Sequence, residues 1–106
     1  MIGMRILSRG NEDENSVKIS EYSLEELKLA YHLAEDAFRN KKNIAKKVKL
    51  EFLLWLCGTR DIKNALEKTS GDYLLILDGP EITENEPGFK EKADPEELER
   101  ISLSRI

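Results

Sequence analysis

Apolar and polar residues follow two different periods along the chain, and these divide it into short strands and longer helices. Residues 4–7, Met-Arg-Ile-Leu, predict a short first strand, and residues 16–20 alternate apolar and polar side chains as a half-buried strand does. We predict that these two strands pair as a hairpin. Residues 73–77 are apolar throughout, which is typical of a strand buried on both faces. This third strand should lie centrally in a sheet.

A first helix is predicted from Leu24 to near Asn40. Ser23 and Glu26 have the spacing of a capping box, in which a hydroxyl and a carboxylate bond the free N–H groups of a helix start. Apolar residues then recur at steps of three and four and form one stripe for the core. The stripe consists of Leu27, Ala30, Tyr31, Ala34, Ala37 and Phe38.

Residues 44–57 predict a second helix, which is apolar almost all round after Lys49 and should be the buried centre of the fold. Gly58 should end it, because glycine readily accepts the left-handed conformation. Thr59 is then placed to cap a third helix, with Asp61 in its first turn. The predicted inner face of that helix consists of Ile62, Ala65 and Leu66.

The last quarter of the chain predicts a loop followed by a helix. Between residues 80 and 93, prolines, a glycine and charged residues favour an exposed loop. Asp94, Pro95 and Glu97 then combine an N-cap, a proline at the first helical position and a capping-box glutamate. The apolar stripe of this helix should pack on the domain or on a partner, and it consists of Leu98, Ile101 and Leu103.

Together these elements predict one α+β domain over residues 1–106, with a small, mostly antiparallel sheet flanked by helices and a central buried helix. Charged residues make up 36% of the chain and hydrophobic residues 40%, as in a soluble globular protein. Since no apolar stretch approaches the ~18–20 residues of a spanning helix, we expect no membrane contact and a cytoplasmic location. The sole cysteine, Cys57, lies in an apolar run and should be a buried structural thiol in a reducing compartment.

Few residues are suited to catalysis. His32 is the only histidine and falls inside the first predicted helix, where we expect a partly exposed structural role. A zinc site needs about four cysteine or histidine ligands, and the chain has one of each. The acidic groups at residues 12–14 and 81–86 lie in predicted loops and lack calcium-binding spacing. We therefore predict a protein that is not an enzyme, with no catalytic residues, no metal and no cofactor.

The turn Gly58-Thr59-Arg60 is the first candidate binding site. The N–H groups at the start of the helix that follows it, together with the guanidinium of Arg60, could hold a phosphate. The alternative is that Gly58 and Thr59 only cap helices and that Arg60 is an ordinary surface residue. No glycine or lysine of a phosphate-binding loop accompanies the turn.

Five lysines within nine residues form the second candidate site. The net charge of the chain is -4, so any basic site must be a local patch. Such a patch could contact phosphates without regard to base sequence, while the alternative is a solvated face of a helix. No aromatic platform for stacking bases accompanies the lysines. The cluster consists of Lys41, Lys42, Lys46, Lys47 and Lys49.

Residues 50–66 resemble the helix–Gly-Thr-Arg–helix segment of the PRPK-binding protein family, the kinase-associated subunit of the KEOPS complex. Family members typically show the pattern Glu-x-Leu-Leu-x-Leu-Ser-Gly-Thr-Arg-Gln-Ile-x-x-Ala. In this chain Cys57 replaces the small polar residue and Asp61 replaces the glutamine. The order of elements between residues 23 and 77 also matches, whereas the two ends match loosely. The short chain, rich in lysine and glutamate, resembles archaeal members.

The resemblance implies a non-catalytic accessory subunit of the assembly that installs threonylcarbamoyl groups on tRNA adenosine. Such a subunit binds the 3′ acceptor end of tRNA and a small atypical kinase/ATPase subunit, which is a separate chain or is fused to the transferase subunit. A homodimer of the isolated chain is also open, and the alternative function is a free-standing RNA-binding module without a kinase partner. The residues assigned to tRNA are Gly58, Thr59, Arg60, Lys46, Lys47 and Lys49, and those assigned to the kinase are Leu98, Ile101 and Leu103.

Overall fold

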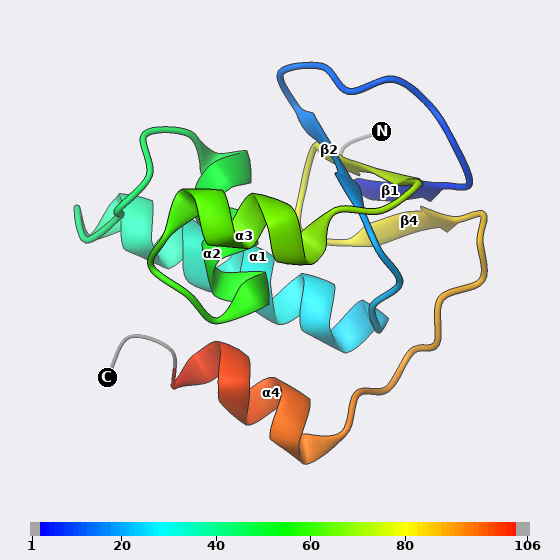
Figure 1. The fold of residues 1–106 in the computed structure, drawn as a ribbon. Coiled ribbons are helices and arrows are strands. Elements are labelled where there is room, and N and C mark those ends of the chain that lie inside the picture. Colours follow the sequence, from blue (N-terminus) through cyan, green and yellow to red (C-terminus); the bar gives the residue numbers. More distant parts are fainter. Residues whose placement is uncertain (1–2, 104–106) are drawn as a thin grey trace.

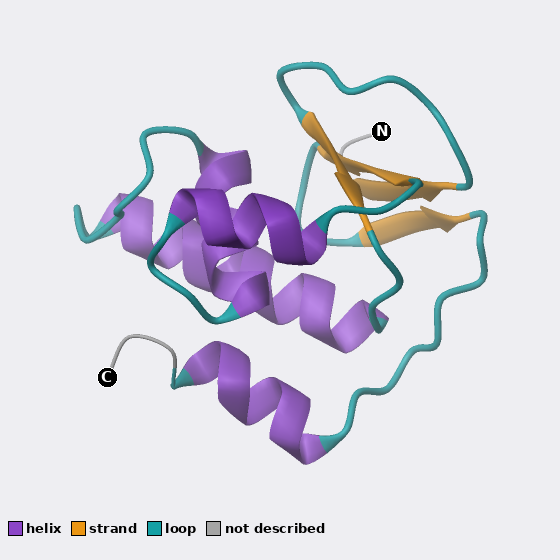
Figure 2. Cartoon of the chain, in the orientation of Figure 1, coloured by secondary structure: helices purple, strands orange, loops and turns teal. Residues whose placement is uncertain are grey.

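Residues 3–103, the part of the chain that the computed structural model describes, form four strands and four helices. The strands are β1 (Met4–Leu7), β2 (Ser16–Ile19), β3 (Tyr73–Leu77) and β4 (Ile82–Asn85), and the helices are α1 (Leu24–Arg39), α2 (Val48–Cys57), α3 (Ile62–Thr69) and α4 (Pro95–Ser102). Figure 1 shows the sheet at one side of the molecule and the helices at the other, with α4 at the far edge from β2. The predicted α+β fold class is confirmed (Figure 2).

The strand order in the sheet is β2-β3-β1-β4, so β3 lies inside the sheet as predicted. It pairs antiparallel with both β1 and β2, and the predicted hairpin of β1 and β2 is therefore wrong. The most apolar strand takes the inner position, where both of its edges are paired. The connection from β1 to β2 instead crosses one face of β3, and Gly10 packs so closely on Leu74 that a side chain there would collide with it. This loop helps to leave Leu74 only 5% exposed.

Strand β4 corrects the prediction of a loop throughout residues 80–93. It pairs parallel with β1, along the edge of β1 that β3 does not occupy. Backbone hydrogen bonds to β1 therefore define this strand, and no hydrophobic pattern in its sequence does. The chain then turns at residues 86–87, and residues 88–94 run as an extended segment to α4 (Figure 1). Within it Phe89 is buried and meets the ring of Tyr73 edge-on, with 5.0 Å between ring centroids.

Helix α1 begins and ends where the sequence predicts. Ser23 Oγ accepts a hydrogen bond from the Glu26 N–H at 3.2 Å, and Glu26 Oε1 accepts one from the Ser23 N–H at 3.0 Å, which completes the capping box. The next free donor of the helix start, the Leu24 N–H, bonds the carbonyl of Lys90 at 2.8 Å. The extended segment is thereby tied across the N-terminus of α1.

Helix α2 is the buried centre of the fold, as predicted, and residues 51–56 are all buried. Together with α1 it packs on one face of the sheet. It begins at Val48, however, and not at Ile44. The main core side chains of the sheet are Met4, Ile6, Val17, Ile19 and Leu75, and those of the two helices are Leu27, Ala30, Ala34, Phe52, Leu54 and Leu56.

Helix α3 is capped by Asp61 and not by Thr59. Asp61 Oδ1 accepts from the Lys63 N–H at 3.1 Å, and the Thr59 hydroxyl oxygen accepts from the Asp61 N–H at 3.2 Å. Aspartate is a strong N-cap, and its position one residue before the helix decides the start. Thr59 therefore fixes the turn and leaves the helix start to Asp61.

The inner face of α3 is narrower than predicted. Ala65 is buried and Ile62 is half-buried, but Leu66 is 48% exposed. Thr69, four residues after Ala65, is buried instead and donates its hydroxyl to the Ala65 carbonyl at 2.7 Å. A short helix packed against one neighbour buries a single narrow stripe, and Leu66 lies about 100° from Ala65 on the helical wheel.

Helix α4 has the predicted start, with the Asp94 N–H donating to Glu97 Oε1 at 3.2 Å. Its residue Ile101 is completely buried in the core of the domain. Between residues 3 and 103, no helix has both the length and the apolar character that a membrane crossing requires.

Candidate functional site

The Gly-Thr-Arg turn follows the C-terminal end of α2, and its Gly58 lies against Arg100 of α4. Gly58 has φ 75° and ψ 35°, the left-handed conformation expected of it, and its N–H bonds the Leu54 carbonyl at 3.0 Å. A Cβ atom at this position would lie 3.1 Å from Arg100 Cγ, closer than ordinary packing allows. Both the backbone conformation and the contact with α4 therefore favour glycine.

Arg60 is exposed and lines a groove of about 400 Å³ between the end of α1, the segment of residues 40–47 and the second half of α2. The apolar lining consists of Leu33, Ala37, Ile44 and Trp55, and the polar lining consists of Asp36, Asn40, Lys42 and Arg60. Two cations beside an apolar floor suit a ligand that has both phosphates and a flat apolar part. Asp36, the acidic member, is engaged by Arg39 at 2.8 Å.

The predicted lysine cluster does not gather around Arg60. Lys49 Nζ donates to the carbonyls of Asp13 at 2.8 Å and Ser16 at 3.4 Å, so it ties α2 to the start of β2. Lys47 lines a different hollow of about 320 Å³, which also contains Glu14. Helix α2, about 15 Å long, separates these lysines from Arg60.

Within the groove, Lys42 accompanies Arg60 in place of the lysines that were assigned to it. Lys46 and Lys47 lie exposed in the segment before α2. Sequence reasoning had placed both in the first turns of a helix, where their side chains would follow helical spacing. Neither side chain lines the groove.

Glu51 is the functional candidate that sequence reasoning missed. Its side chain is completely buried, and its Oε1 accepts the N–H groups of Ile44 and Ala45, each at 2.9 Å. These bonds hold the preceding segment outside the helix, which explains why α2 starts at Val48. The available signal was one glutamate inside the otherwise apolar run of residues 50–56.

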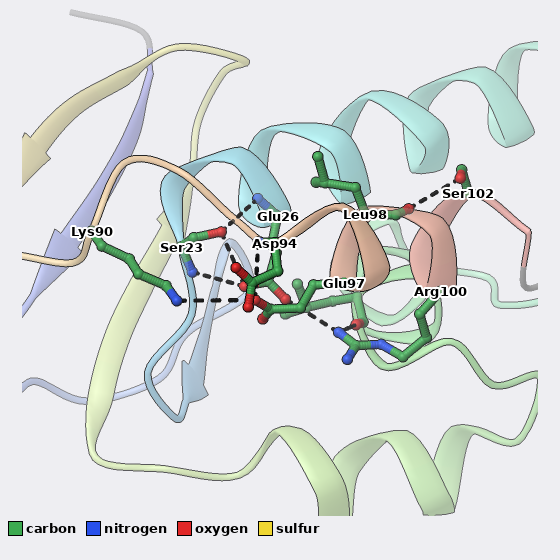
Figure 3. A network of polar contacts seen from close by, with 9 residues as sticks. Ser23, Glu26, Lys90, Asp94, Glu97, Leu98, Arg100 and Ser102 are labelled. Atoms are coloured by element: carbon green, nitrogen blue, oxygen red, sulfur yellow. Dashed lines mark hydrogen bonds and ion pairs between the residues drawn. The ribbon is translucent and has the colours of Figure 1, made fainter.

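A network of charges joins α4 to α1 (Figure 3). Arg100 donates to Glu26 Oε2 at 3.2 Å and to the carbonyl of Leu56 at 3.4 Å, and the Glu26 side chain is only 1% exposed. Lys90 approaches Glu97 to 3.9 Å. The backbone N–H of Asp94 is the main cause that lowers the pKa of Glu97, and Glu26, Lys90 and Arg100 act in the same direction. This network anchors α4 over the Gly-Thr-Arg turn.

The three residues assigned to the kinase differ in exposure. Ile101 is 0% exposed, so the expectation that it faces a partner is corrected: it belongs to the core of the domain. Leu98 is half-buried, and Leu103 is 52% exposed. A helix of this length has one apolar stripe, and the domain itself covers most of it.

Cys57 and His32 have no arrangement that suggests chemistry. The thiol of Cys57 is half-buried in a hollow of about 240 Å³ with Tyr22, Lys68 and Arg100, and burial raises its pKa, which opposes formation of a thiolate nucleophile. His32 is exposed and pairs with Asp36 at 3.4 Å. In the described part of the chain, no three acidic, histidine or cysteine side chains are grouped so as to hold a metal ion.

No protein-family model matches this chain, and no curated protein matches it either.

Proposed function

We propose that this protein is a non-catalytic accessory subunit that binds the 3′ acceptor end of tRNA and the atypical kinase/ATPase subunit of KEOPS. The groove beside the Gly-Thr-Arg turn is the observation that carries the proposal. Arg60 and Lys42 supply positive charge there, over an apolar lining that includes Trp55. The resemblance of residues 50–66 to the PRPK-binding family supplies the biological setting.

A single-stranded RNA end fits this groove better than a duplex does. Its unstacked bases can occupy an apolar groove while its phosphates meet cations, and stacking of one base contributes about 1–3 kcal/mol. A groove of about 400 Å³ has room for a nucleotide or two and not for a helix. Lys41 and Lys46 are exposed on the segment of residues 40–47, part of which lines the groove, and Lys47 lies at the end of that segment beside the other hollow. Their charge adds attraction that does not depend on base sequence.

The proposal predicts that Arg60→Glu weakens tRNA binding about tenfold or more at low salt, because a phosphate contact becomes a repulsion. Lys28→Glu is the matched control, since it makes the same charge change at an exposed position of α1 outside the groove. Each variant should be titrated with intact tRNA and with the same tRNA lacking its single-stranded 3′ end. Equal affinities of the Arg60 variant and wild type for intact tRNA would eliminate the groove as the site.

For the kinase, we assign the contact to the exposed end of α4. Leu103 is the most exposed large apolar residue of the described part, at 52%, and it is the C-cap of a helix that the domain already anchors. Leu103→Arg should therefore reduce recovery of the co-expressed kinase while leaving the thermal unfolding of the free chain unchanged. Undiminished recovery would contradict this assignment.

The alternative function, a free-standing RNA-binding module, uses the same groove and needs no kinase. Purification of the tagged chain from its native cell distinguishes the two. Recovery of a kinase and a transferase supports the accessory subunit, and recovery of tRNA alone supports the module.

A further inference from the structure

One wall of the groove is a segment with little structure of its own. Residues 40–47 belong to no helix or strand, and Lys41 has a positive φ of 56°, which is uncommon for a residue with a side chain. Of this segment only Ala45 is fully buried, while Ile44 is 44% exposed. A chain so exposed has few apolar contacts to fix its course. Something else must hold Lys42 and Ile44 at the groove.

The side chain of Glu51 supplies that hold. It projects from the first turn of α2 and its Oε1 accepts two successive N–H groups, those of Ile44 and Ala45, at 2.9 Å each. Hydrogen bonds to a carboxylate are about twice as strong as those between neutral groups. Because the side chain is 0% exposed, water competes little for these bonds. Asn43 adds a weaker local bond from its side chain to the Ala45 carbonyl, at 2.8 Å.

We propose that Glu51 is a positioning residue of the RNA-binding groove: it fixes residues 42–45 before the ligand arrives. This inference rests on the proposed function, because it names the residue that prepares the same groove. A segment that is already ordered loses less conformational entropy on binding, and affinity rises accordingly. Glu51 itself lies beneath the groove wall and touches no ligand.

The chain contains a matched control for this role. Glu26 is also a buried glutamate in the first turn of a helix, and its Oε1 also accepts two hydrogen bonds, from the N–H and the hydroxyl of Ser23, while its Oε2 accepts one from Arg100. It lies at the start of α1, and the groove is lined by the second half of that helix. Glu26→Gln and Glu51→Gln therefore remove the same charge from two equally buried sites, only one of which contacts the groove wall.

Two measurements on these variants test the proposal. The rate of amide hydrogen exchange at Ile44 and Ala45 measures how strongly Glu51 restrains the segment, and titration with intact tRNA measures binding. Glu51→Gln should speed exchange of both amides about tenfold and weaken tRNA binding about threefold to tenfold, because neutral acceptors replace a charged one. Glu26→Gln, which also weakens the bond from Arg100, should lower the thermal midpoint and leave exchange of the Ile44 and Ala45 amides as in wild type.

The possible outcomes separate this inference from the proposed function. Faster exchange in Glu51→Gln with unchanged tRNA affinity overturns the positioning role, and so does unchanged exchange. Equal losses of affinity in both glutamine variants also overturn it, since they would reflect stability alone. If Arg60→Glu binds tRNA as wild type does, the groove is eliminated as the RNA site and the proposed function fails. If Arg60→Glu loses affinity and Glu51→Gln gives one of the results above, only the positioning role is overturned.

Discussion

The starts of α1 and α2 each contain a buried glutamate, and the two serve different purposes. At α1, Glu26 bonds Ser23 three residues before it, so the carboxylate completes its own helix start. At α2, Glu51 reaches back six and seven residues to Ala45 and Ile44, and the helix start itself has no side-chain cap. The same residue type thus stabilises a helix in one place and orders a loop in the other.

The two helix starts also differ in how far other parts of the chain cover them. The start of α1 is enclosed, with the extended segment bonded to its first N–H groups and Arg100 of α4 bonded to Glu26. The segment before α2 faces solvent and presents exposed lysines. Enclosure suits a region whose task is stability, and exposure suits a region that meets a ligand. Changes near α1 should therefore affect unfolding, and changes near Glu51 should affect binding more.

The largest effect should follow from Ile101→Ala, which weakens the enclosure of α1. Ile101 is 0% exposed and is part of the core that α4 shares with α1 and α2. Its truncation should lower the free energy of unfolding by about 2–5 kcal/mol, because buried surface is lost and a cavity remains. Urea denaturation followed by the fluorescence of Trp55, the only tryptophan, measures this loss.

Leu103→Ala is the control for that experiment, because this residue directly follows the same helix as its C-cap but is 52% exposed. It should change the free energy of unfolding by no more than about 0.5 kcal/mol. A loss of similar size in both variants would mean that α4 does not distinguish a core face from an outer face. Burial of Ile101 would then not be what encloses the start of α1.

The difference between the two starts also explains how much of the fold could be predicted. A capping box, a helical stripe and a buried strand depend on neighbours in the sequence, and α1, α4 and β3 were found on those signals. Strand β4 and the start of α2 depend on partners elsewhere: the free edge of β1, and a carboxylate bonded to a loop. Local sequence patterns do not show which distant residues an element will contact. Strand β4 was therefore not predicted, and the start of α2 was predicted four residues too early.

In the candidate site, too, the features set by local sequence could be predicted and those set by distant contacts could not. Arg60 and the left-handed Gly58 could be recognised from the unusual turn. That Lys42 accompanies Arg60, and that Lys49 is engaged by the carbonyls of Asp13 and Ser16, depends on how the segment before α2 folds back. Sequence proximity grouped the lysines correctly by charge, but it could not show on which side of α2 each one lies.

The smallest effect should come from Glu97→Gln, which alters the electrostatic part of the α1 enclosure and leaves its apolar part intact. The pKa of Glu97 is lowered from its usual value of 4.5, chiefly by the Asp94 N–H. The folded chain thus favours the charged form, so this stabilisation is present above about pH 4.5 and is lost as the pH falls through the lower folded pKa. The variant should melt about 1–2 °C below wild type near neutral pH.

That difference should shrink towards zero as the pH falls from about 5 to about 3, because wild type then loses the stabilisation that the variant lacks. Thermal melts across this range measure it. Glu96→Gln, one residue earlier and exposed, makes the same charge change and controls for net charge. If the two variants give parallel curves, net charge alone explains the effect, and the links of Glu97 to Lys90 and Glu26 add nothing to the enclosure of α1. A gap that narrows only for Glu97→Gln would instead show that α4 is held to α1 by charge as well as by Ile101.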